Sequence, residues 1–276
     1  MSLTRSDGPL SGHPPETVNY RLEGPKHKLL MQEFPRRVRA TFGGQTVLDT
    51  TRGMLLHETG LPPQLYVPVE DIRADPIQPT EHHTYCPFKG TASYWTVTAA
   101  RQGQQSQRAE NAIWSYPEPN AEARWLLGYA GFYWGAMDEW YDEDERVAGN
   151  GQGHLRDPYH RVDVRRSSRR VRVRLNDSDT VLAETTHPLL LSETGLPNRF
   201  YIPAGDVRQD LLEPTDTHTH CPYKGTASYW SVDADDRKLT DAVWSYPQAE
   251  GDSAAVSGYL SFLHDDLTVE VGEPES

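Results

Sequence analysis

One ten-residue motif occurs twice in the chain, and this duplication constrains the fold more than any other feature. Residues 86–95 read CPFKGTASYW and residues 221–230 read CPYKGTASYW, so the copies differ only at Phe88 and Tyr223. The two motifs also contain the only two cysteines of the chain, at the same position in each copy. Internal similarity of this kind indicates a repeated structural unit. The sequence therefore predicts one fold that is built twice.

The duplication extends well beyond this motif. HETGLPPQLYVP (57–68) resembles SETGLPNRFYIP (192–203), and the spacing between the copies stays constant as far as Trp95 and Trp230. A later AIWSYP segment matches AVWSYP in the second copy. Each copy spans roughly one hundred residues, which is a normal size for a compact domain and too long for one unit of a solenoid or propeller. We expect two fused copies of one domain, related by an approximate two-fold axis.

The matching segments, and the composition between them, divide the chain into five parts. Residues 142–160 have the glycine and charge content of a linker, and the first 33 residues are rich in proline, glycine and polar side chains. We predict an N-terminal arm (1–33), a first repeat domain (34–141), a linker (142–167), a second repeat domain (168–268) and an acidic tail (269–276).

The local patterns within each copy favour short β-strands. Val171, Val173 and Leu175 alternate with arginines, which predicts a strand with one apolar face. The TASYW and AIWSY segments are rich in the β-branched and aromatic residues that strands prefer. Only AEARWLLGYAGFY, from Ala121, suggests a helical turn. We therefore expect a mainly β protein with antiparallel sheets, about seven or eight strands and one short helix per copy.

Composition and charge exclude several classes of protein. The net charge of −13 disfavours nucleic-acid binding. The sequence contains no apolar stretch of 18 residues, so we expect no membrane-spanning helix. The first twenty residues lack the apolar region of a secretory signal, and one cysteine per copy does not form a disulfide framework. We expect a cytoplasmic monomer or homodimer. The seven arginines from Arg161 to Arg174 predict either a solvated linker or an anion-binding patch.

The repeated Cys-Pro-(Phe/Tyr)-Lys-Gly motif is the strongest candidate for chemistry. Proline fixes φ and glycine permits positive φ, so the motif predicts a tight loop that leads into a strand. A lysine near the cysteine would favour the thiolate, and the histidine three residues earlier could act as a base. Alternatively, the cysteine packs as a small apolar group, while the lysine and histidine have only structural roles. The candidate catalytic residues are Cys86, Lys89 and His83 in the first copy and Cys221, Lys224 and His218 in the second.

A second set of residues predicts a ligand pocket beside this loop. In each Trp-Ser-Tyr-Pro segment the tryptophan and tyrosine share one face of a strand. Together with the tryptophan that ends the ten-residue motif, they would either line an aromatic pocket or pack in the core. The glutamate of each ETGLP segment could face the lysine. The candidate ligand-binding residues are Glu58, Trp95, Trp114 and Tyr116 in the first copy and Glu193, Trp230, Trp244 and Tyr246 in the second.

Metal and cofactor sites of familiar types are not predicted. Structural zinc uses four nitrogen or sulfur ligands, whereas the motif regions offer only three in each copy, namely His82, His83 and Cys86, and His218, His220 and Cys221. No P-loop, GxGxxG, GxSxG or HExxH pattern is present. We therefore expect neither a bound zinc ion nor a cofactor.

These motifs together resemble a known bacterial family. The arginine-valine openings, the ETGLP–tyrosine–proline stretches, the CPYKG signature and the WSYP segments are similar to those of the domain of unknown function 427. The resemblance covers most of residues 36–140 and 156–265 and also includes RDPYHRVDVRRSSRRVRV, from Arg156. It implies a small β-tent, or Mss4-like, domain, an architecture whose members bind zinc through Cys-x-x-Cys knuckles or ligands in a tryptophan cage. The knuckles are absent here. The family has also been given a nucleotidyltransferase-type name, but this chain shows no paired carboxylates around a Gly-Ser loop.

Three functions are compatible with the sequence. The first is a module that binds a small molecule in each copy, between the CP(F/Y)KG loop and the WSYP strand. The second is an enzyme that uses the cysteine or lysine, with the histidine, in acyl, nucleotidyl or thiol-redox chemistry. The third is a structural or interaction protein. The reactivity of the thiols distinguishes the first function from the second.

Overall fold

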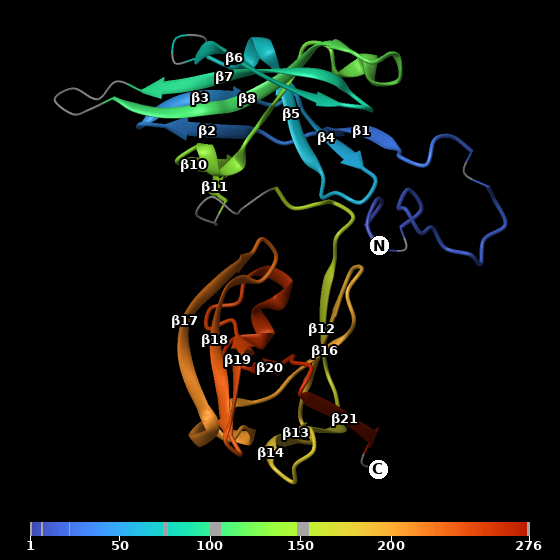
Figure 1. Ribbon diagram of the computed structural model, residues 1–276, viewed down its shortest axis with the longest axis vertical. Coiled ribbons are helices and arrows are strands. Elements are labelled where there is room, and N and C mark those ends of the chain that lie inside the picture. The colour runs from blue at the N-terminus through green and yellow to red at the C-terminus, as the bar shows by residue number, and fades with distance from the viewer. Residues whose placement is uncertain are drawn as a thin grey trace. The chain divides into compact units, whose positions relative to one another are not determined.

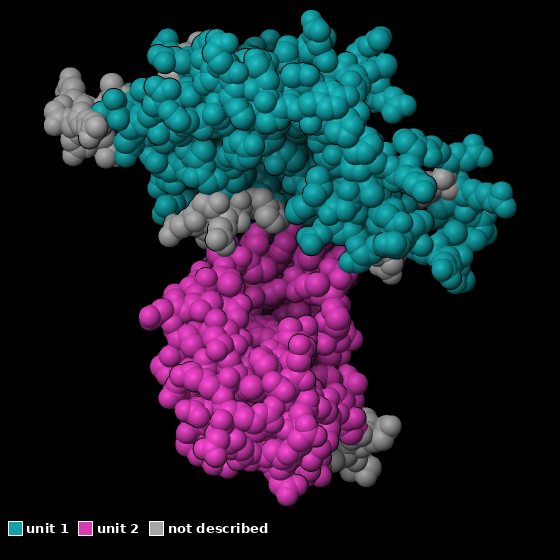
Figure 2. Space-filling model, viewed as in Figure 1, with its two compact units in different colours: residues 1–159 teal, residues 160–276 magenta. Residues whose placement is uncertain are grey.

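The apolar–polar alternation of the sequence forms antiparallel β-structure in two units, residues 1–159 and 160–276 (Figures 1 and 2). The computed structural model describes residues 2–6, 8–21, 23–73, 75, 77–99, 106–147 and 155–274. The expectation of a mainly β protein with two tandem domains is confirmed. Within the described residues, no helix is long and apolar enough to cross a membrane.

The first unit contains one large and one small sheet (Figure 1). The large sheet has seven strands in the order β1 (Leu29–Phe34), β4 (Gly53–Glu58), β5 (Gln64–Pro68), β9 (Tyr129–Phe132), β8 (Gln107–Pro119), β7 (Gly90–Ala99) and β6 (Ile77–Cys86). The small sheet has four strands in the order β11 (Glu145–Arg146), β10 (Glu139–Asp142), β2 (Val38–Phe42) and β3 (Gln45–Thr50).

Two separate apolar clusters form in the first unit. In the main core, Val38 and Ala40 of β2 pack with Val97 and Ile113 of the large sheet, and all four side chains are buried. A second cluster contains residues that alternate with these along the same strands, and we call it the aromatic cluster. Its buried members are Leu56, Tyr66, Ala92, Tyr94, Tyr116, Ala123 and Leu126. Because successive strand residues point to opposite faces, the large sheet can contribute to both clusters.

The second unit repeats this strand order. One three-stranded sheet runs β12 (Val162–Arg166), β15 (Leu189–Glu193) and β16 (Arg199–Tyr201), and a four-stranded sheet runs β17 (Leu212–Cys221), β18 (Gly225–Ala234), β19 (Arg237–Ser245) and β20 (Leu260–Phe262). A bridge between Ile202 and Leu260 connects them in the order of the large sheet of the first unit. The third sheet runs β14 (Val181–Thr185), β13 (Arg169–Leu175) and β21 (Leu267–Pro274).

Among the described residues, the helical segments are all short 3₁₀ helices. The turn predicted from Ala121 is η2 (Ala121–Leu126), and its counterpart in the second unit is η6 (Gly251–Val256). In η2, Ala123 and Leu126 are buried in the aromatic cluster. The remaining segments have three residues each, namely η1 (Val69–Asp71), η3 (Trp134–Ala136), η4 (Ala204–Asp206) and η5 (Gln209–Leu211).

Several strands lie outside the predicted limits of the two repeat domains. β1 begins in the predicted arm, β12 lies in the predicted linker, and β21 extends into the predicted acidic tail. The described part of the first unit contains eleven strands and that of the second contains ten, so the expected seven or eight was too few. β1 and β12 are edge strands with few fully buried side chains, so their sequences lack a clear apolar alternation.

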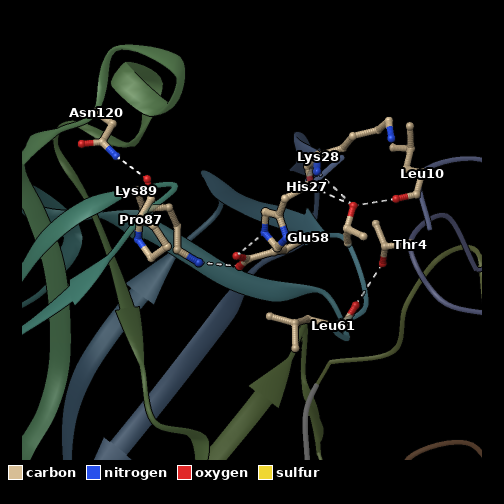
Figure 3. Close-up of polar contacts among 10 residues, drawn as sticks. Thr4, Leu10, His27, Lys28, Glu58, Leu61, Pro87, Lys89 and Asn120 are labelled. Atoms are coloured by element: carbon tan, nitrogen blue, oxygen red, sulfur yellow. Dashed lines mark hydrogen bonds and ion pairs between the residues drawn. The ribbon is translucent and has the colours of Figure 1, made fainter. Parts of the chain in front are cut away.

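The arm that precedes β1 packs against the turn that follows β4 (Figure 3). The hydroxyl of Thr4 donates a hydrogen bond to the Leu61 carbonyl (2.9 Å), and the Gly60 amide donates to the Thr4 carbonyl (2.8 Å). The Thr59 hydroxyl donates to the Leu10 carbonyl (2.7 Å). The ETGLP turn of the first unit is therefore covered by the beginning of the chain.

Candidate functional site

The CPFKG motif forms a tight loop between β6 and β7. The Lys89 amide donates to the Cys86 carbonyl (3.2 Å), and the Asn120 amide donates to the Lys89 carbonyl (3.0 Å). Gly90 has φ of +105°, and a Cβ at this position would lie 3.0 Å from the Glu118 carbonyl oxygen. Glycine is therefore required by both the backbone conformation and the close approach of β8.

The lysine of this loop points into the protein and pairs with the glutamate of the ETGLP segment (Figure 3). Lys89 Nζ forms an ion pair with Glu58 Oε2, and the other carboxylate oxygen lies 2.9 Å from His27 Nε2. Glu58 and Lys89 are only 7% and 9% exposed. A buried charge is tolerated when it is paired and hydrogen-bonded, and this carboxylate has a partner for each oxygen.

The second unit contains the same three groups. Lys224 Nζ pairs with Glu193 Oε2, and His160 Nε2 lies 3.0 Å from Glu193 Oε1. Burial acts to raise the pKa of the Glu193 carboxyl, but the His160 hydrogen bond and the Lys224 charge outweigh it and hold the pKa below its usual value. Glu193 is therefore ionised at neutral pH, and Lys224 faces a full negative charge.

In each unit, the aromatic residue of the loop stacks on the histidine that contacts the glutamate carboxylate. The Phe88 and His27 ring centres are 3.7 Å apart with the planes 11° from parallel. For Tyr223 and His160 the separation is 4.1 Å and the angle is 27°. The one difference between the two motifs thus preserves a flat ring at this position. We call the lysine, glutamate, histidine and stacked ring of each unit the loop clamp.

The tryptophan of each WSYP strand packs against the aromatic cluster of its unit, which in the second unit includes the buried residues Leu191, Tyr201 and Tyr246. The CP(F/Y)KG loop borders the same cluster through its cysteine. Trp114 Nε1 donates to the Tyr66 hydroxyl, and Trp244 Nε1 donates to the Tyr201 hydroxyl, both at 3.1 Å. Burial raises the pKa of Tyr201 to about 12 and that of Tyr66 higher still. These hydroxyls therefore stay neutral and act as fixed hydrogen-bond acceptors for the indoles.

Both indoles remain partly exposed. Trp114 packs closely over Gly131, where a Cβ would lie 2.5 Å from the ring, and its ring centre is 4.8 Å from that of the half-exposed Tyr133. In the second unit, the Arg199 guanidinium lies 6.0 Å from the Trp244 ring centre. The indole of each WSYP strand is thus half-buried and has a fixed orientation.

The structure brings most of the predicted site residues of each copy together. Cys86 and Trp114 pack against the aromatic cluster, Tyr116 is buried in it, and the Lys89–Glu58 pair lies beside it. In the second unit, Cys221, Trp244 and Tyr246 have the equivalent positions, and Lys224 Nζ lies 5.9 Å from the Tyr246 ring centre. Both cysteines are half-buried free thiols.

The remaining predicted residues lie elsewhere. Trp95 and Trp230 pack against the main cores, because they alternate with the strand positions that face the aromatic clusters. His83 alternates with Thr84 and Cys86 along β6, and its Nδ1 lies 3.3 Å from the Ser93 hydroxyl. His218 has the equivalent position opposite Ser228. The structure therefore does not place these histidines as bases for the thiols.

Sequence reasoning missed the histidines of the two loop clamps. His27 and His160 precede the edge strands β1 and β12, in segments that were predicted as arm and linker. A weak signal was present, since HKLLMQEF from His27 and HRVDVRRS from His160 both begin with histidine and a basic residue. The spacing between these segments differs by two residues from that of the main repeat, which hides the match.

Metal-ligating side chains are not gathered at this site. Within the described ranges, no group of three or more histidine, cysteine, aspartate or glutamate side chains could hold a metal ion. Of the three side chains that the first motif region offers to a zinc ion, His82 lies 4.6 Å from the Tyr94 ring centre, whereas His83 points to the opposite face of β6. The arrangement is that of an ion-paired loop beside an aromatic surface.

The hollows of the described surface include three that are not lined by the CP(F/Y)KG loops. One in the first unit, of about 380 Å³, is apolar and lined by Leu29, Leu30, Met31, Met54, Trp125 and Tyr129. Two in the second unit, of about 590 and 600 Å³, adjoin each other and share Thr186, His187 and Tyr259.

Comparison with known proteins agrees with the repeated architecture. Two segments, residues 30–143 and 163–273, match the model of a family described as a domain of unknown function, DUF427. A search of the curated proteins found no match to the chain. The matched segments begin within β1 and β12, so they include these edge strands but start just after the histidines of the loop clamps, His27 and His160. The chain therefore belongs to the DUF427 family and contains two copies of its domain.

Proposed function

We propose that each unit binds a small planar molecule on the exposed face of the tryptophan in its WSYP strand. The observation that carries this proposal is a half-buried indole, fixed through its N–H by a buried tyrosine, in both units. Stacking on a ring whose orientation is already fixed costs little conformational entropy. An indole face attracts aromatic rings and cations. We expect a heteroaromatic ligand, because its ring can stack while its polar edge faces solvent or nearby hydroxyls.

The loop clamp has a positioning role in this proposal. The lysine, glutamate and histidine connect the loop, the end of β4 or β15, and the residues before β1 or β12. These segments surround the aromatic cluster from which the indole projects. The lysine nitrogen is held against the glutamate carboxylate in both units, so it is not presented to a substrate. The positive charge of the lysine therefore stabilises the loop, and its nitrogen does not react with a substrate.

The same geometry makes thiol chemistry the weaker alternative. A reactive cysteine needs a partly exposed thiolate with a cation or base nearby. Cys86 packs against tyrosines and apolar residues, and the positive charge of Lys89 is directed at Glu58. The predicted base, His83, lies on the other face of β6. We therefore favour binding over catalysis by the cysteine.

The two units are expected to differ in affinity. In the first unit Tyr133 extends the ring surface beside Trp114. Leu263 has the equivalent position in the second unit, where Arg199 also approaches Trp244. A stacked ligand would have to displace this guanidinium. We expect the first unit to bind a planar ligand more tightly than the second.

Saturation-transfer NMR with indole, nicotinamide and uracil as probes tests the proposal. Trp114→Leu and Trp244→Leu should each reduce the transferred signal, and the double variant should abolish it. Trp125→Leu is the matched control, because Trp125 is also exposed but lies in a different hollow of the first unit. A double variant that retains the full signal with all three probes would contradict the proposal.

A further inference from the structure

A comparison of the two units identifies a position that is filled in the first and empty in the second. In the first unit the Arg52 guanidinium pairs with Asp71, with its Nε 3.1 Å from Asp71 Oδ2. It also pairs with Glu70 at 2.6 Å. The Thr50 hydroxyl donates to Asp71 (2.6 Å) and accepts from the Arg52 amide (3.0 Å). The arrangement is a guanidinium held by a carboxylate next to a buried threonine.

The second unit retains the threonine and the aspartate of this arrangement but not the arginine. Thr185 and Asp206 have the positions of Thr50 and Asp71, and the Thr185 hydroxyl again accepts a bond, from the His187 amide at 3.1 Å. His187 replaces Arg52, and Gly205 replaces Glu70. Among the residues that the structure describes, no cation lies within ion-pair distance of the Asp206 carboxylate. The second unit therefore keeps the aspartate, but it has no equivalent of Arg52, which neutralises Asp71 in the first unit.

A hollow of about 590 Å³ lies at this position. Its lining includes Thr185, His187, Asp206 and Tyr259. Two long side chains of the first unit have shorter counterparts here, because histidine is shorter than arginine and glycine has no side chain. Glu184 also lines it, but Arg170 and Arg172 already bind this carboxylate, at 2.6 and 2.8 Å from their Nε atoms. Asp206 is therefore the carboxylate available to a ligand.

We propose that this hollow binds the guanidinium group of a small-molecule ligand, in the place that Arg52 occupies in the first unit. The carboxylate of Asp206 would accept two parallel N–H bonds, which is the preferred geometry between guanidinium and carboxylate. The first unit shows that this fold accommodates such a pair at the equivalent position. This site is distinct from the Trp244 surface, so it adds to the function proposed above.

The adjoining hollow indicates the other end of the ligand. It has a volume of about 600 Å³ and shares Thr186, His187 and Tyr259 with the first. Arg166, Ser167 and Ser168 also line it, and they provide a positive charge and hydroxyl groups. Such groups bind carboxylates and phosphates. The ligand class is therefore a guanidino compound that carries an acidic group, of which L-arginine is the simplest probe.

Binding is expected to be weak for such a small probe. Exposed ion pairs contribute about 1 kcal/mol or less each, and Asp206 and Arg166 are both exposed. Two such contacts and several hydrogen bonds correspond to dissociation constants on the order of millimolar. Amide chemical shifts in two-dimensional NMR detect binding in this range.

The test is a titration of the full-length ¹⁵N-labelled protein with L-arginine. Amides around Thr185, His187 and Asp206 should shift in a saturable manner. Asp206→Asn should weaken binding about fivefold, which corresponds to the roughly 1 kcal/mol of one exposed ion pair. Asp179→Asn, which removes an exposed carboxylate in the β13–β14 turn, should leave it unchanged. The absence of saturable shifts, or equal binding by Asp206→Asn, would overturn the proposal.

A substitution that fills the proposed position makes the test more specific. His187→Arg should supply the missing guanidinium from the chain itself and abolish arginine binding. If His187→Arg binds arginine as well as the native chain does, the proposed position is wrong.

Two further measurements test the ligand class and the independence of the site. Agmatine has the same guanidinium but no carboxylate, so it should bind more weakly than L-arginine, and equal binding would overturn the assignment of the Arg166 end. Trp244→Leu should leave arginine binding intact, which separates this site from the proposed stacking surface. Loss of arginine binding in that variant would contradict a separate site.

Discussion

At the scale of single residues, the buried lysine of each loop has the clearest energetic role. Lys224 and Glu193 both have side chains less than one-tenth exposed. Removing one partner of a buried pair leaves the other charge without compensation, which costs more than the intact pair contributes. The pair therefore makes the loop conformation dependent on both residues.

Replacing Lys224 by methionine should lower the free energy of unfolding of the second unit by about 3–5 kcal/mol, because Glu193 would remain buried without its cation. Lys238→Met is the matched control, since Lys238 pairs with Glu213 on the surface. That change should cost less than about 1 kcal/mol. Urea denaturation measures both values, and equal losses would show that the Lys224 pair is not buried in solution.

The thiols provide a second test at this scale. Because Cys86 packs against the aromatic cluster and Lys89 is directed at Glu58, we expect slow labelling by a thiol reagent in the folded protein. Lys89→Met should accelerate labelling, because it loosens the loop that covers the sulfur. Lys28→Met, near the same turn, should not. If Lys89→Met slows labelling strongly, the lysine activates the thiolate and the enzyme alternative gains support.

A buried histidine predicts a pH dependence in the first unit. His57 is fully buried, and neither ring nitrogen has a hydrogen-bond partner. Burial lowers its pKa from 6.5, with partial opposition from Asp157. The unfolded chain therefore binds a proton at a higher pH than the folded chain does. The resulting stability is present above about pH 6.5 and is lost as the pH falls through the folded-state pKa.

The midpoint of thermal unfolding of the first unit should fall between about pH 7.5 and pH 5.5 more steeply than that of His57→Leu. Other titrating groups are common to both proteins, so the difference reports on His57. Circular dichroism at the two pH values measures it. Parallel behaviour of the two proteins would show that His57 is not buried as a neutral ring.

At the scale of elements, the loop between paired strands depends on one glycine in each unit. Gly225 has φ of +92°, and a Cβ would lie 3.0 Å from the Gln248 carbonyl oxygen. Gly225→Ala should destabilise the second unit by more than about 1 kcal/mol, because alanine is strained at positive φ. Gly205→Ala is the control, since its added Cβ would meet nothing within 4 Å. Similar unfolding midpoints in urea for both variants would contradict the loop geometry.

The elements also show what sequence patterns can and cannot reveal. β13 was predictable because Val171, Val173 and Leu175 alternate with arginines and are all buried. β1 was missed because its side chains do not alternate between buried and exposed positions. Its first four residues are all partly exposed. Edge strands gain their pairing from a neighbour that is distant in sequence. A single sequence does not specify that neighbour.

The candidate site was predictable to the same extent. The tight loop could be predicted because proline fixes φ and glycine permits positive φ. The sequence only suggested the pairing of its lysine with Glu58, because both residues lie in repeated motifs. The position of Trp95 depends on the register of β7 and on which of its faces meets the aromatic cluster. Neither property is visible in the alternation of residues alone. His27 required knowledge of an edge strand that the pattern did not show.

At the scale of the whole molecule, the two copies share one framework but present different surfaces. Trp125, Leu127 and Tyr133 of the first unit correspond to Ala255, Ser257 and Leu263 of the second. The loop clamps and the Trp–Tyr hydrogen bonds are the same in both. Residues that define the fold and the two WSYP tryptophans are thus retained, while several exposed side chains differ. We expect related ligands with unequal affinities.

The most direct test of this account is a crystal structure after soaking with indole, nicotinamide or uracil. The account predicts a planar fragment stacked on Trp114, with the same pose at lower occupancy on Trp244. The Lys–Glu–His geometry should be unchanged by the fragment, since the clamp positions the loop and does not contact the ligand. Fragments that bind elsewhere while both indole faces stay empty, or fragments bonded to Cys86 or Lys89, would contradict it.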